Sequence, residues 1–100
     1  MIYTILIFTK LEKDKYGPDF GCERLVGYYT DKDNAFAAVV NNSCDINETC
    51  YNYALIEEVE EGLYNPAFNR WWFKFNYDKG EYEQIDDPDV VNHYCGFTIG

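Results

Sequence analysis

The sequence predicts an α+β protein: an antiparallel sheet of four or five strands with one helix on one face, in the order β-β-α-β-β. Several segments are rich in β-branched and aromatic residues, and only one segment, residues 30–42, has helical periodicity. Strands accompanied by a single helix are typical of the α+β class. One helix cannot cover both faces of a sheet, so we expect the opposite face to be largely open and aromatic. A chain of 100 residues predicts one domain, residues 1–100.

The first nine residues, "MIYTILIFT", are apolar on both faces, which is typical of a central strand covered on both sides. Residues 10–21 contain Gly17, Pro18 and Gly21 and are predicted to be a loop or a long hairpin connection. Residues 22–30, "CERLVGYYT", form the second predicted strand. Gly27 within it indicates a bulge or a close backbone approach.

The predicted helix begins after Thr30, a candidate N-cap, with Asp33 three residues later. Its apolar stripe consists of Ala35, Phe36, Val39 and Val40. Asn41 and Asn42 are suitable stops because asparagine tolerates the left-handed conformation. We therefore expect a helix of about three turns.

Residues 51–62 form the third predicted strand, and residues 69–86 form the clearest hairpin. The aromatic residues of its first strand share one parity, and an even loop would oppose Tyr77 to Tyr82 and Phe75 to Gln84. An odd loop would oppose the aromatic row to glutamates, so we expect the even register. Residues 94–99 are a candidate last edge strand or C-terminal tuck.

The chain is strongly acidic, and its acidic residues are unevenly distributed along the sequence. The net charge is -10, and residues 45–100 carry twelve acidic and three basic residues, a net charge of -9. Such a charge opposes direct binding to nucleic acid or to an anionic membrane and favours a basic partner. The N-terminus lacks the basic region and cleavage site of a signal peptide, so we expect a cytoplasmic protein with reduced cysteines.

Four glutamates fall within residues 57–61, and Glu57 shares its parity with apolar Leu55 and Val59. A buried Glu57 would be a candidate general base. The alternative, which we prefer, is a bulge or strand end that lets the carboxylate reach water. No known catalytic motif accompanies these acids, so we expect no enzyme, no catalytic residue and no cofactor.

Metal binding is also not expected. Cys44 and Cys50 are separated too widely, and His93 and Cys95 too closely, for the usual ligand pairs of structural zinc sites. The aromatic content of 19% suggests protein-binding anchors flanked by acid, since a stacking platform for single-stranded nucleic acid needs a positive groove. Many of the same aromatic side chains are also needed to fill the hydrophobic core.

The segment "ALIEEVEEGLYN…RWWFKFN…GEYEQIDDP", together with the preceding "GYYTDKDNA", resembles small acidic proteins of gut bacteria and their phages. The resemblance covers residues 25–88 loosely and carries no catalytic motif. By type, a short acidic chain of this kind is similar to phage anti-defence proteins, of which anti-CRISPR proteins are the best known.

We therefore expect a non-enzymatic inhibitor that binds a basic nucleic-acid-binding groove of a host defence protein and blocks its access to nucleic acid. The expected host protein is a CRISPR effector nuclease. The predicted contact residues are Glu57, Glu58, Glu60, Glu61, Tyr64, Trp72, Glu81, Tyr82, Glu83, Asp86, Asp87 and Asp89. A monomer and a homodimer both remain open. One alternative is a small-ligand or nucleotide-signal binding protein whose open sheet face forms an aromatic pocket, either in a monomer or in a dimer. Another is a regulatory subunit without an inhibitory role.

Overall fold

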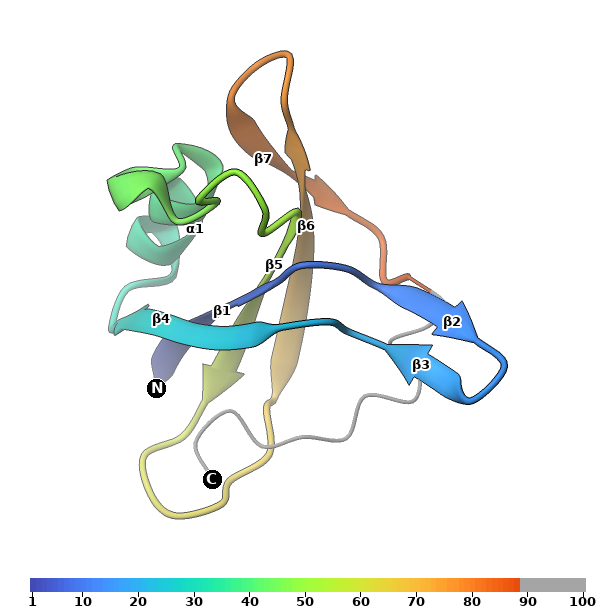
Figure 1. The fold of residues 1–100 in the computed structure, drawn as a ribbon. Coiled ribbons are helices and arrows are strands. Elements are labelled where there is room, and N and C mark those ends of the chain that lie inside the picture. The colour runs from blue at the N-terminus through green and yellow to red at the C-terminus, as the bar shows by residue number, and fades with distance from the viewer. Residues whose placement is uncertain (89–100) are drawn as a thin grey trace.

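A five-stranded antiparallel sheet with the strand order β4-β1-β5-β6-β7 organises the chain. The computed structural model describes residues 1–88. The strands of this sheet are β1 (Ile2–Phe8), β4 (Glu23–Tyr29), β5 (Tyr53–Val59), β6 (Asn69–Asn76) and β7 (Glu81–Ile85). The helix α1 (Lys32–Val40) packs on one face of the sheet (Figure 1). This arrangement confirms the predicted α+β class.

β1 is the central strand that its apolar sequence predicts, because it pairs with β4 on one side and β5 on the other. Its pairing with β4 contains an irregularity: Ile5 opposes Gly27 and Leu6 opposes Leu25, so that Val26 is an extra residue. The bulge predicted at Gly27 is thereby confirmed.

Residues 10–21 form the predicted long hairpin connection. Its strands, β2 (Glu12–Asp14) and β3 (Gly17–Asp19), make a small second sheet that extends beyond the main one (Figure 1). An ion pair of 2.8 Å between Lys10 Nζ and Asp19 Oδ2 joins the two arms of the connection.

The helix begins one residue later than predicted. Asp31, in extended conformation, is the N-cap, and its Oδ1 accepts a hydrogen bond of 3.1 Å from the Asn34 amide; the prediction of Thr30 is therefore wrong. A carboxylate at this position also interacts favourably with the helix dipole. The predicted stop is confirmed, because Asn41 is the C-cap and Asn42 has a left-handed φ of 50°.

Both faces of the sheet have a buried core. The core under the helix consists of Ile5, Ile7, Ala35, Val39, Ala54, Ile56, Phe73, Phe75 and Tyr82. On the opposite face, Leu6, Phe8, Leu55 and Trp72 are buried, with Leu11, Phe20, Tyr53 and Ile85 packed against them. The prediction of a largely open second face is therefore wrong for its centre, since Leu11 and Phe20 from the β1–β4 connection cover it.

The β6–β7 hairpin has the even register that the side-chain pattern predicts, but it is displaced by two residues. Phe75 opposes Tyr82 and Asn76 opposes Glu81, so the predicted pairing of Tyr77 with Tyr82 is wrong. The ladder ends at Asn76 because its Oδ1 accepts the amide of Asp78 at 2.9 Å and that of Lys79 at 3.2 Å. A shift of two residues leaves every side chain on its predicted face.

The remaining element is a short 3-10 turn, η1 (Ser43–Asp45), between α1 and β5. The candidate strand at residues 94–99 lies outside the described residues.

Candidate functional site

The loop between β5 and β6 carries exposed acid and exposed apolar side chains together. Glu60 and Glu61 are exposed, and three large apolar residues beside them are also exposed: Leu63 (84%), Tyr64 (66%) and Phe68 (60%). We call these five residues the acidic loop. The loop lies at the end of the sheet opposite the β6–β7 turn (Figure 1).

Internal contacts hold the acidic loop in one shape. Asn65 Nδ2 donates to the carbonyl oxygens of Glu60 at 3.3 Å and Glu61 at 2.9 Å, across the turn. The Phe68 amide donates to the Glu58 carbonyl at 2.8 Å, where the loop joins β6. These bonds reduce the conformational entropy that the loop would lose on binding a partner.

The backbone of this turn has positive φ at two positions. Gly62 has a φ of +133°, which residues with a side chain rarely adopt, and a Cβ added there would lie 2.8 Å from Asn65 Nδ2, so another residue would be strained and would displace the Asn65 amide. Tyr64 has a positive φ of 56°, which is unusual for an aromatic residue. Strain of this kind concentrates at functional sites, and the Tyr64 side chain is exposed.

A shallow hollow of about 520 Å³ adjoins the acidic loop. It is lined by Met1, Ile2, Tyr28, Thr30, Glu60, Glu61 and Gly62. Its wall combines two carboxylates with apolar side chains from β1 and β4. A cationic side chain with a long aliphatic stem, such as arginine or lysine, is complementary to such a lining.

Glu58 lies next to the acidic loop but is engaged within the protein. Its Oε2 accepts a hydrogen bond of 2.9 Å from the Tyr3 hydroxyl, and its Oε1 accepts one of 2.9 Å from Asn69 Nδ2. These two bonds, first that from Asn69, hold the pKa of Glu58 below its ordinary value. Glu58 therefore contributes charge near the loop, while Glu60 and Glu61 supply the exposed carboxylates.

Glu57 is not a surface residue, which corrects the predicted contact set. Its side chain is 1% exposed, and its Oε2 accepts a hydrogen bond of 2.7 Å from Arg70 Nε. The preferred expectation of a bulge or strand end is also wrong, because β5 pairs continuously with β1 and β6 through this residue. Burial raises the pKa of Glu57, although the Arg70 guanidinium opposes the shift.

Trp72 and Tyr82, predicted as surface anchors, belong to the core. Trp72 is 1% exposed, with its ring centroid 5.5 Å from that of Phe8. Tyr82 is fully buried, and its hydroxyl donates to the Tyr51 carbonyl at 2.6 Å. Burial raises the pKa of Tyr82. Neither side chain is available to a partner, so both predictions are corrected.

Of the remaining predicted acids, two lie on the edge strand β7 and two follow it directly in the sequence. Glu81 and Glu83 belong to β7, where Glu83 accepts a hydrogen bond from Asn76, and Asp86 and Asp87 follow the strand. Glu81 begins β7 next to the β6–β7 turn, at the far end of the sheet from the acidic loop. Glu81 therefore does not share a surface with Glu60 and Glu61, and Asp89 lies outside the described residues.

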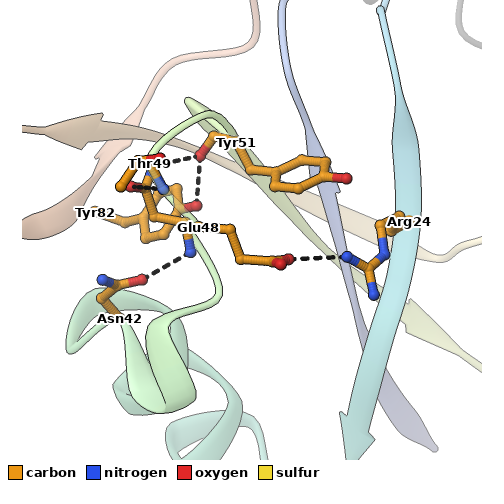
Figure 2. Close-up of polar contacts among 7 residues, drawn as sticks. Arg24, Asn42, Glu48, Thr49, Tyr51 and Tyr82 are labelled. Atoms are coloured by element: carbon orange, nitrogen blue, oxygen red, sulfur yellow. Dashed lines mark hydrogen bonds and ion pairs between the residues drawn. The ribbon is translucent and has the colours of Figure 1, made fainter.

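A second unusual region is the connection between α1 and β5, drawn in Figure 2. Five of its residues other than glycine have positive φ: Asn42, Cys44, Asp45, Glu48 and Thr49. The buried Asn47 holds it, because its Nδ2 donates to the Tyr51 carbonyl and its Oδ1 accepts from the Thr49 amide, both at 2.9 Å. Glu48 forms an ion pair of 2.8 Å with Arg24 of β4 (Figure 2).

Metal ligands are not gathered in the part of the chain that the structure describes, because no group of three or more His, Cys, Asp or Glu residues within 1–88 could hold an ion. Cys22, Cys44 and Cys50 are exposed free thiols. His93 and Cys95, considered above as ligands, lie outside these residues. None of the helices in residues 1–88 has the length and apolar character needed to cross a bilayer.

Leu63 and Phe68 are the site residues that sequence reasoning missed. Both stand in the turn-rich segment between Gly62 and Asn69, where no strand or helix pattern would bury them, and that is the available signal. The comparisons with known proteins give no further guide: no family model, no curated protein and no solved structure matches the chain.

Proposed function

We propose that the protein is a non-enzymatic acidic inhibitor whose acidic loop binds a basic nucleic-acid-binding groove of a host defence protein. The proposed partner class is a CRISPR effector nuclease in the host cytoplasm. The observation that carries the proposal is the pairing of exposed Glu60 and Glu61 with the exposed side chains of Leu63 and Tyr64 on one restrained turn. The choice of partner class rests on the resemblance to phage anti-defence proteins.

Electrostatics support a basic partner. The chain has 18 acidic and 8 basic residues, so ten or more acids remain uncompensated even if every base forms one ion pair. One of those bases, Arg70, is already paired with the buried Glu57 and adds little positive charge near the loop. A groove lined with Lys and Arg to hold nucleic acid would attract this surface and accelerate association.

Apolar anchors support a specific complex rather than a purely ionic one. Exposed charge pairs contribute little net affinity, whereas aromatic and aliphatic side chains inserted into pockets dominate most interfaces. Tyr64 and Leu63 are suited to that role because they are exposed on a loop that needs little further ordering. In this proposal the carboxylates steer the encounter and the apolar side chains retain the partner.

The proposed mechanism is occupancy without chemistry. The inhibitor occupies the groove in place of nucleic acid and is not consumed or turned over. Inhibition should then saturate at a fixed molar ratio and leave the partner and its guide RNA covalently unchanged.

The test is a titration of the protein into guide-loaded CRISPR effector nucleases of several types, with the binding of labelled target DNA as the readout. We expect loss of DNA binding to one type, saturating stoichiometrically, with unchanged partner mass by mass spectrometry. Substoichiometric inhibition that grows with time would contradict the non-enzymatic mechanism. Unaffected DNA binding across all types would contradict the proposed partner class.

A further inference from the structure

The edge strand β4 is unusually apolar for an exposed strand. Four of its seven residues are large exposed hydrophobic residues: Leu25 (50%), Val26 (37%), Tyr28 (65%) and Tyr29 (38%). Within residues 1–88, no strand pairs with the side of β4 that faces away from β1, because β4 is the first strand of the sheet order. The other edge, β7, is short and carries Glu81 and Glu83, the kind of charge that protects an edge from pairing.

The bulge divides the side chains of β4 between the two faces in a definite way. Gly27 opposes Ile5, which belongs to the core under the helix, and in a bulge two residues, here Val26 and Gly27, oppose the same partner residue, so we place both on the helix face. Arg24 and Tyr29 oppose Ile7 and Tyr3 and share that face, whereas Leu25 and Tyr28 oppose Leu6 and Thr4 on the other face.

Open space lies above Gly27. An added Cβ at this position would meet no atom within 4 Å, and the adjoining hollow has a volume of about 180 Å³. Its apolar lining includes Ile5, Ala38 and Ile46. An apolar side chain from outside the molecule could therefore be buried at this point on the edge.

We propose that two copies of this chain associate by antiparallel pairing of their β4 strands, about a two-fold axis between Val26 and Gly27. This register opposes residues of the same face, as a continuous sheet requires: Val26 faces Gly27 of the second copy, and Leu25 faces Tyr28 of the second copy. Val26 then occupies the open space above the glycine. Arg24 meets the ring of Tyr29 of the second copy, a favourable cation–aromatic pairing.

The distribution of charge favours this edge for self-association. Two copies with a charge of -10 each repel one another, and the acid is concentrated in residues 45–100. β4 contains one acid, Glu23, and one base, Arg24, so its net charge is zero. Pairing through β4 joins the copies at a neutral apolar strand, in contrast to the acidic β7 edge. This inference goes beyond the proposed function and does not depend on it.

The test compares the parent with Val26→Lys, and with Gln84→Lys on the exposed β7 edge as a matched control. Sedimentation over a wide concentration range should show the parent passing from monomer to dimer. Val26→Lys should weaken the dimer about a hundredfold, because the symmetry brings both added charges to the interface. Gln84→Lys should leave it unchanged.

Amide hydrogen exchange supplies an independent readout. Exchange of the β4 amides should slow as the parent concentration rises, while the amides of the acidic loop stay unaffected. A parent that remains monomeric at every concentration, or a Val26→Lys variant that dimerises as well as the parent, would overturn the proposal. Should Val26→Lys fail to fold by circular dichroism, Leu25→Lys provides the same test on a half-exposed residue.

Discussion

The carboxylate of Glu57 accepts a 2.7 Å hydrogen bond from Nε of Arg70, which stands directly opposite it on β6. Glu57 is buried, whereas the Arg70 side chain is 33% exposed, so the guanidinium connects an interior charge to the surface. The second carboxylate oxygen, Oε1, is buried and has no hydrogen-bond partner among residues 1–88. This cross-strand pair removes one glutamate from the surface and neutralises one arginine, so the exposed excess of acid comes from residues such as Glu60 and Glu61.

Arg70→Met should destabilise the fold, because it leaves the Glu57 carboxylate buried without its counter-charge. We expect a loss of about 2 kcal/mol in the free energy of unfolding, below the usual range for buried pairs since Arg70 is partly exposed. Urea denaturation measures this loss. The double variant Glu57→Gln/Arg70→Met should recover part of it, and a single variant as stable as the parent would show that the pair contributes nothing.

The pH dependence of stability should reveal the raised pKa of Glu57. A carboxyl group whose folded pKa lies above its ordinary value of 4.5 binds protons more readily in the folded state, so it lowers stability as the pH rises from 4.5 through the raised pKa. Glu57→Gln lacks this group. The free energy of unfolding of the variant minus that of the parent should therefore increase over this pH interval, measured by urea denaturation at a series of pH values. A constant or decreasing difference would be incompatible with a raised pKa.

Gly62→Ala should disturb the acidic loop more than Gly80→Ala disturbs the β6–β7 turn. Both glycines have positive φ, but only at Gly62 would the added Cβ crowd a neighbour, Asn65 Nδ2, at 2.8 Å. We expect a loss of about 2 kcal/mol at Gly62 and about 1 kcal/mol at Gly80. Thermal unfolding measures both losses, and faster amide exchange confined to residues 60–65 would localise the first. Equal losses would mean that Asn65 yields without cost.

Asn47→Ala should destabilise the connection between α1 and β5. It removes the side-chain bonds to the Tyr51 carbonyl and the Thr49 amide from a position that is 3% exposed. We expect a loss of about 2 kcal/mol, because the buried Asn47 side chain supplies two hydrogen bonds that order this segment and alanine supplies neither. The exposed helix C-cap Asn41 is the control, and Asn41→Ala should change stability by less than about 0.5 kcal/mol. Matching losses in chemical denaturation would mean that Asn47 does not organise this segment.

Periodicity and composition were sufficient to predict most of the fold. The apolar run of β1, the single amphipathic helix and the alternation of β6 each identify an element, because each reflects which face must be buried. Details set by individual hydrogen bonds were less accessible. Asn76 ends the β6–β7 ladder two residues early, and Asp31 replaces Thr30 as the N-cap.

The candidate site was predictable only in part. Glu60, Glu61 and Tyr64 lie in one loop because β5 ends at Val59. The burial of Glu57 was not predictable, because Arg70 becomes its neighbour only through the β5–β6 register. The sequence does not show that residues of the β1–β4 connection cover Trp72, or that the Tyr82 hydroxyl donates to the Tyr51 carbonyl. Without these two contacts, both side chains resemble surface aromatics. Long-range pairing, rather than local propensity, decided these positions.

The central claim is that the acidic loop is the surface that contacts a basic groove. The most direct measurement is the dissociation constant of the complex with the inhibited guide-loaded effector, at low and high salt, for the parent and Glu60→Lys/Glu61→Lys. The control is Glu12→Lys/Asp14→Lys, which changes the net charge equally at exposed positions of the β2–β3 hairpin. We predict that the loop variant weakens binding about a hundredfold at low salt, less at high salt, and that the control weakens it by less than about threefold. Equal weakening by the two variants, or none by the loop variant, would contradict the account.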